Sequence, residues 1–131
     1  MEYLNVLAAA VVGFGYGAVH YTVLSKPWMQ AAGVKMDANG KPMGNGSILP
    51  FAMSILAMIL VAGMMRHVFV MGGIDTVGKS ALSGLSIGAF FIAPWTMINN
   101  GYAGRPFLLT IIDGAYAIIG CTLMGVVLAL F

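Results

Sequence analysis

The chain has 131 residues, of which 60% are hydrophobic and only 8% are charged, with a formal net charge of +2. Soluble domains carry about 25% charged residues, so this chain has too little charge to cover a water-facing surface, which excludes a soluble enzyme and a disordered tail. It also has no basic stripe for nucleic-acid phosphates. The composition predicts a single integral membrane domain over residues 1–131, with the lipid bilayer as its main partner.

Long apolar segments are the main structural signal. A helix needs roughly 20 apolar residues to cross the hydrocarbon core, and suitable segments cover residues 4–24, 48–71, 80–98 and 107–131. Their backbone groups must be satisfied within each segment, and none shows the alternation expected of barrel strands. The sequence therefore predicts an all-α fold, a bundle of four transmembrane helices.

The first connection, residues 25–46, is the longest of the three. Residues 26–32 are predicted to form a short interfacial helix, in which Trp28 suits the headgroup level as an anchor. Asn39-Gly40 and Asn45-Gly46 predict turns in the remainder of this connection. Arg66, near the end of the second span, is expected to extend to the membrane surface as a second anchor.

The distribution of basic residues favours one orientation. The first and third connections share one side of the membrane, and the second shares the other side with the termini. The first side carries four basic residues and the second carries two, namely Lys26, Lys35, Lys41 and Arg105 against Arg66 and Lys79. Because basic residues accumulate on the cytoplasmic side, both termini are predicted to be non-cytoplasmic.

Small residues recur every four positions in three of the spans. Such stripes let helix backbones approach closely in lipid, where helix association gains little from hydrophobicity. One interpretation is packing within a single bundle, and the other assigns one stripe to a homodimer or a partner subunit. The stripes are Ala9, Gly13 and Gly17; Ser80, Gly84 and Gly88; and Ala117, Cys121 and Gly125.

A few polar residues lie inside the spans, where each is costly. Asp113 shares a helix face with Ala117, His20 lies three residues after Gly17, and Asn99 lies eleven residues after Gly88, close to three full turns. The topology brings all three polar residues toward the same side of the membrane. We expect His20, Asn99 and Asp113 to form one polar cluster, with Tyr21 and Tyr116 close by. This cluster could be structural, a proton or ion relay, or a ligand site.

Other chemical motifs fail on their context. His20 and His67 lie at opposite membrane ends and cannot share a haem iron, and no Cys/His set has metal-ligand spacing. The eleven methionines are more typical of flexible packing than of copper binding. No hydroxyl stands at a diagnostic spacing from His20 for nucleophilic catalysis. We therefore predict no metal, no cofactor and no enzymatic activity.

Two groups of residues resemble the small bacterial membrane proteins of domain-of-unknown-function family 1761. Near the start these are Gly17-Ala18-Val19-His20-Tyr21, Lys26-Pro27-Trp28-Met29 and Gly33, and near the end Asp113-Gly114-Ala115-Tyr116 and Gly125. The resemblance implies four membrane helices and no known activity. The family usually has an aromatic residue at the position of His20, which favours Asp113 and Tyr116 as site residues.

The leading functional interpretation is a non-enzymatic accessory or scaffold subunit of the bacterial inner membrane, which packs against other membrane subunits or against itself. It follows from the near absence of soluble mass and from the small-residue stripes. The alternative is a small oligomeric transporter or channel with Asp113 as its ionisable site, since four-helix transporters must assemble to enclose a pathway.

Overall fold

A computed structural model of the protein describes residues 3–35, 38 and 48–131. The predicted turns at Asn39-Gly40 and Asn45-Gly46 and the basic residue Lys41 lie outside the described residues. The elements, in chain order, are the α-helices α1 (Leu4–Val23), α2 (Ser25–Ala32), α3 (Leu49–Met71) and α4 (Val77–Ile87), the π-helix η1 (Gly88–Ile92), and the α-helices α5 (Ala93–Tyr102) and α6 (Phe107–Leu130).

Helices long and apolar enough to cross a membrane occur four times in the described residues. They are α1, α3, the continuous rod Val77–Tyr102 made of α4, η1 and α5, and α6, with 20, 23, 26 and 24 residues. At 1.5 Å per residue they are about 30 to 39 Å long, enough for a bilayer core. This confirms the all-α, four-span prediction, although the third span runs from residue 77 to 102 rather than from 80 to 98.

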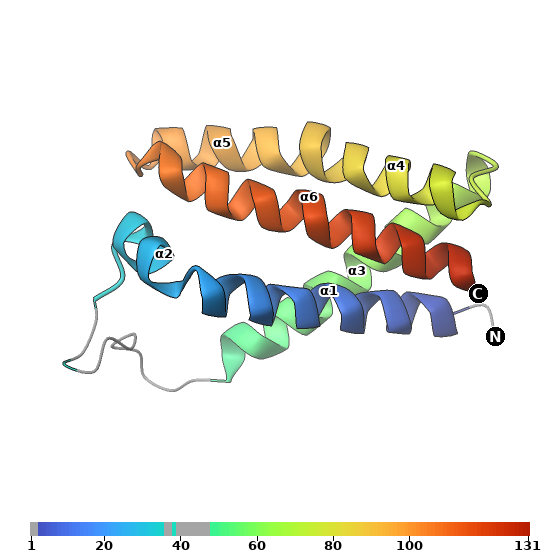
Figure 1. The fold of residues 1–131 in the computed structure, drawn as a ribbon, viewed down its shortest axis with the longest axis horizontal. Coiled ribbons are helices and arrows are strands. Elements are labelled where there is room, and N and C mark those ends of the chain that lie inside the picture. Colours follow the sequence, from blue (N-terminus) through green and yellow to red (C-terminus); the bar gives the residue numbers. More distant parts are fainter. Residues whose placement is uncertain (1–2, 36–37, 39–47) are drawn as a thin grey trace.

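The chain passes up and down, so both termini lie at the same end of the bundle (Figure 1). The short helix α2 and the turn between α5 and α6 lie at the opposite end. Two glycines with positive φ allow the chain to reverse there: Gly33 at +74° ends α2, and Gly104 at +69° lies between α5 and α6. Glycine adopts this left-handed conformation without the steric cost of a Cβ atom.

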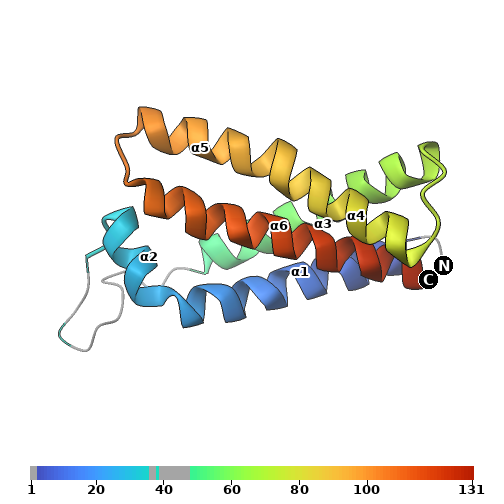
Figure 2. The same ribbon diagram turned by 45° about the horizontal axis from the view of Figure 1, so that its top comes forward.

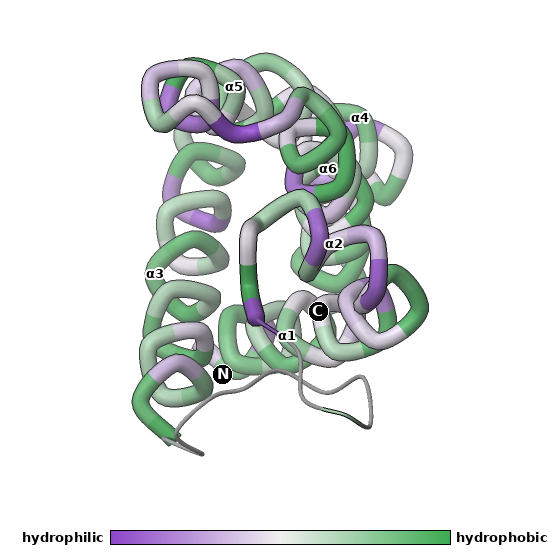
Figure 3. Tube along the Cα trace, turned by 90° about the vertical axis from the view of Figure 1, so that its left-hand side faces the viewer, coloured by the Kyte–Doolittle hydropathy of each residue, from purple (hydrophilic) through white to green (hydrophobic). Residues whose placement is uncertain are grey.

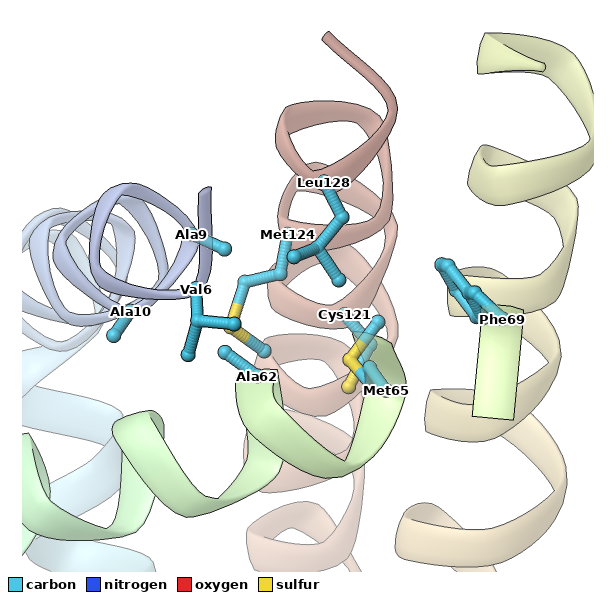
Figure 4. Close-up of a cluster of buried hydrophobic side chains, with 9 residues drawn as sticks. All are labelled: Val6, Ala9, Ala10, Ala62, Met65, Phe69, Cys121, Met124 and Leu128. Atoms are coloured by element: carbon cyan, nitrogen blue, oxygen red, sulfur yellow. The ribbon is translucent and has the colours of Figure 1, made fainter. Parts of the chain in front are cut away.

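Helix α6 is the centre of the bundle, with its most extensive contacts to α4 on one side and to α1 on the other (Figure 2). A cluster of buried hydrophobic side chains lies where α1, α3 and α6 meet, and it consists mostly of small residues and flexible methionines (Figure 4). Its members are Val6, Ala9, Ala10, Ala62, Met65, Phe69, Cys121, Met124 and Leu128.

Helix α3 differs along its length. Its second half packs on α1 and buries Ala62, Met65 and Phe69, whereas every residue from 50 to 57 is exposed. Those eight residues make more than two turns, so this half of the helix is exposed on all of its faces. Seen along the bundle, α3 lies to one side of α6 and is largely hydrophobic (Figure 3). Such an all-round apolar helix is typical of a lipid-exposed or partner-covered segment.

Candidate functional site

His20 is buried in α1 and joins α1 to α6. Its Nε2 atom lies 2.8 Å from the carbonyl oxygen of Ile112, and its Nδ1 atom lies 3.0 Å from the hydroxyl of Tyr16. A carbonyl oxygen can only accept, so Nε2 must carry a hydrogen. In the neutral ring Nδ1 then accepts from the Tyr16 hydroxyl, and both ring nitrogens are satisfied. A satisfied, buried imidazole of this kind orients the helices and has no lone pair left for a metal.

Asp113 is half-buried in α6 and accepts a hydrogen bond from Tyr21, the residue that follows His20. The hydroxyl of Tyr21 donates to Oδ1 of Asp113 over 2.7 Å. Asp113 lies six residues after the start of α6, about 9 Å along the helix axis. Among the residues that the structure describes, Asp113 forms no salt bridge, and the Tyr21 hydroxyl is the hydrogen-bond donor to its carboxyl group.

Tyr116 completes a group of packed rings. Its hydroxyl donates to the carbonyl oxygen of Gly13 over 3.2 Å, and its ring centroid lies 5.3 Å from that of Tyr21 and 5.7 Å from that of His20. A Cβ atom on Gly17 would lie 2.8 Å from the Tyr116 hydroxyl, so this glycine makes room for the ring. We call this group the aromatic cluster; it consists of Tyr16, His20, Tyr21, Trp28 and Tyr116.

Asn99 is not part of this site, and its predicted place in the polar cluster is wrong. The prediction counted eleven residues from Gly88 along a regular α-helix. The π-helix η1 at residues 88–92 breaks that regularity, because a π turn holds about one residue more than an α turn. The face that should have carried Asn99 therefore carries Asn100. Asn99 is exposed, and Asn100 donates to the hydroxyl of Thr110 in α6 over 3.2 Å.

The predicted small-residue stripes face one another within the chain. A Cβ atom added to Gly84, Gly88 or Gly125 would collide with a backbone carbonyl across the α4–α6 contact: those of Cys121, Ala117 and Ser80 respectively. Gly13 and Gly17 similarly receive the side chains of Met124 and Tyr116 from α6. All of these positions are used by packing inside the bundle, so they leave no free stripe for a partner.

The two predicted interfacial anchors lie at opposite ends of the bundle. Trp28 in α2 is half-buried against Tyr21, with the ring centroids 5.8 Å apart and the planes at 75°. The guanidinium of Arg66 lies 5.3 Å above the ring of Tyr3, near the chain termini. Trp28 therefore does more than mark the membrane surface, because it also forms one wall of the aromatic cluster.

Sequence reasoning missed two polar contributors to the α1–α6 contact. Tyr16 lies four residues before His20, a spacing that places both on one helix face, and this signal was available. Asn5, near the other end of α1, is buried and its side-chain amide donates to the carbonyl oxygen of Leu128 over 3.4 Å. Asn5 lies at the start of an apolar segment, where a polar residue is unremarkable.

Asp113 lines more than one cavity. One of about 360 Å³ lies under α2 and is lined by Tyr21, Ser25, Trp28, Met29 and Asp113. Another, of about 280 Å³, faces α3 and α5, and Tyr21, Thr96, Asp113 and Tyr116 contribute its polar groups. In the described part of the chain, no three His, Cys, Asp or Glu side chains gather closely enough to hold a metal ion.

The four apolar helices and the polar contacts between them define a multi-pass membrane protein. The family model "Protein of unknown function (DUF1761)" matches residues 4–129. The chain belongs to this family, as the resemblance of its opening and closing motifs predicted. Neither a curated protein nor a solved structure matches it.

Proposed function

We propose that this protein is a non-enzymatic membrane subunit that binds another transmembrane helix, supplied by a partner protein or by a second copy of the chain. The observation that carries this proposal is the exposure of residues 50–57 of α3 on every face. We further propose that it resides in the bacterial inner membrane, with both termini non-cytoplasmic, as the basic residues favour.

An apolar groove runs between α3 and the third span. It has a volume of about 430 Å³, and its walls include Leu60, Met64, Ile87 and Phe91. Val61 and Ile92 line both this groove and the 280 Å³ cavity that contains Asp113. A transmembrane helix seated here would fill the groove by close packing and would shield a carboxylate from acyl chains; both gains are available to helices in lipid, where hydrophobicity itself contributes little.

One observation favours the alternative, a small oligomeric transporter or channel. Asp113 and Tyr21 line the cavity under α2 as well as the cavity that faces α3. A carboxylate accessible from two sides is suited to passing a proton or cation between them. In this alternative a second copy of the chain would cover the exposed residues 50–57 of α3 and complete the pathway for the proton or cation.

Site-specific crosslinking tests the proposed helix-binding surface. A photo-reactive residue at Ile55, on the exposed half of α3, should crosslink in native membranes to one defined protein, identified by mass spectrometry. Leu82, which is also apolar and exposed and lies on α4, is the matched control and should give lipid adducts only. Equal crosslinking at both positions, or lipid adducts alone at Ile55, would contradict the proposal.

Reconstitution separates the two functions. The purified protein in sealed vesicles should leave an imposed pH gradient intact if it is an accessory subunit. If it is a proton-coupled transporter, the gradient should decay and Asp113→Asn should abolish the decay. Asp75, a carboxylate exposed near the opposite end of the bundle, provides the control variant Asp75→Asn.

A further inference from the structure

The cavity under α2 has the composition of a binding site for an organic cation. Its walls hold one carboxylate, two aromatic rings, two hydroxyls and a thioether, supplied by Asp113, Tyr21, Trp28, Ser25 and Met29. Its volume of about 360 Å³ lies within the range of small-molecule binding sites. This cavity lies on the α2 side of Asp113 and shares no lining residue with the groove along α3.

The carboxyl group in this cavity suits a positively charged partner. Asp113 offers one oxygen to the Tyr21 hydroxyl, and no residue in the described part of the chain donates to its other oxygen. The described residues provide no cation in contact with it. A carboxylate within about 10 Å of the helix end, at the margin of the hydrocarbon core, is costly without a counter-charge. A cation bound in this cavity would remove that cost.

The aromatic walls select an organic ammonium over a metal ion. The Tyr21 and Trp28 rings meet edge to face, with centroids 5.8 Å apart and planes at 75°, and both line the cavity. Two rings at this angle suit a substituted ammonium, which is attracted to ring faces and accepts apolar contact. Calcium or magnesium would need six or more oxygen ligands, whereas this cavity is lined by one carboxylate and two hydroxyl groups.

We propose that the cavity lined by Tyr21, Trp28 and Asp113 binds an organic ammonium group, with Asp113 as counter-ion and the two rings as walls. Two sources share this chemistry: the ethanolamine headgroup of a phospholipid, and a free amine from the aqueous phase. The surroundings fit the lipid headgroup, because Lys26 is exposed on α2 and the exposed Arg105 donates to the Ala32 carbonyl at the end of α2 over 3.4 Å. Both cations suit a lipid phosphate.

Native mass spectrometry of the full chain tests this site. The protein is released from nanodiscs made of phosphatidylethanolamine and phosphatidylglycerol in equal amounts, and the retained lipids are counted. The wild type should retain phosphatidylethanolamine preferentially. Asp113→Asn, which keeps an acceptor for Tyr21 but loses the charge, should lower this preference about tenfold, and Trp28→Leu should do so about fivefold. Asp75→Asn should leave it unchanged.

Two further measurements distinguish a lipid headgroup from a free amine, and a loss of binding from misfolding of the variant. If about 10 mM ethanolamine displaces the bound lipid from the wild type but not from Asp113→Asn, a free amine can occupy the site. Trp28→Leu leaves both partners of the Tyr21–Asp113 bond in place, so its loss of preference would report on the ring itself. Equal retention of both lipids by the wild type, with no effect of ethanolamine, would overturn the proposal. Crosslinking at Ile55 is independent of this result.

Discussion

Helix α6 is held in two different ways by its two principal neighbours. Against α4 the contact is made by backbone, since Gly84 and Gly88 lie directly on the carbonyls of Cys121 and Ala117. Against α1, toward the α2 end of the bundle, the contact is made by long polar side chains: His20 and Tyr21 hydrogen-bond to Ile112 and Asp113. Both solutions are available in lipid, where hydrophobicity contributes little to association between helices.

The two interfaces differ in what they tolerate. A contact between two backbones has no side chain that can rotate away, so an added methyl group must move a whole helix. A contact between side chains can adjust its rotamers, and each hydrogen bond between membrane helices contributes only about 0.6 kcal/mol on average. The α4–α6 interface therefore fixes the distance between helices, whereas the α1–α6 interface can accommodate a ligand or a changed residue beside Asp113.

The largest expected effect comes from the backbone contact. Gly84→Ala places a methyl group against the Cys121 carbonyl, and we expect a loss of about 3 kcal/mol in stability, as for severe overpacking. The measurement is the thermal midpoint of the monodisperse protein in mild detergent.

Gly15→Ala is the matched control for this substitution. Gly15 is also helical, but a Cβ atom there would meet nothing within 4 Å. The control should be neutral or stabilise by up to about 1 kcal/mol, because alanine has the higher helix propensity. Equal destabilisation by both substitutions would show that the close α4–α6 contact does not form.

A smaller effect is expected at the polar interface. His20→Leu removes two side-chain hydrogen bonds and introduces an apolar side chain of similar length. It should lower the stability of the protein by about 1 to 2 kcal/mol. His67→Leu, at an exposed position on α3, should change the thermal midpoint little. A greater loss for His67→Leu than for His20→Leu would contradict the assignment of His20 to the α1–α6 contact.

Gly17 and Tyr116 combine both kinds of contact and should not behave independently. Gly17→Ala places a methyl group 2.8 Å from the Tyr116 hydroxyl and should cost about 1 kcal/mol, since the ring can shift. Tyr116→Phe removes the bond to the Gly13 carbonyl and should cost about 0.6 kcal/mol. The double variant should lose less than the sum of the two, because the phenylalanine ring leaves more room. Strict additivity in this double-mutant cycle would mean that the two residues do not touch.

The spans and their packing faces could be predicted from sequence because both depend on regular spacing. Length and hydropathy locate the four helices, and the four-residue repeats place Gly13, Gly84 and Gly125 at interfaces. His20, Tyr21, Asp113 and Tyr116 could be brought together for the same reason. The apolar groove beside α3 could not be predicted from the sequence. Apolar residues are spread around that helix, so its sequence contains no signal for the side that turns inward.

The third span is where regular spacing failed, and it provides the finest test. Asn100→Ala removes the bond to Thr110 and should lower stability by about 0.5 kcal/mol, whereas Asn99→Ala should have no measurable effect. The two residues are chemically identical and adjacent, so only the phase of the helix distinguishes them. If Asn99→Ala proved the more harmful, residues 88–92 would form a regular α-helix and Asn99 would return to the interface with α6. The comparison of Asn99→Ala with Asn100→Ala involves the smallest expected change in stability, yet it reports most directly on η1. This π-helix sets the phase of α5 beside the 280 Å³ cavity that contains Asp113.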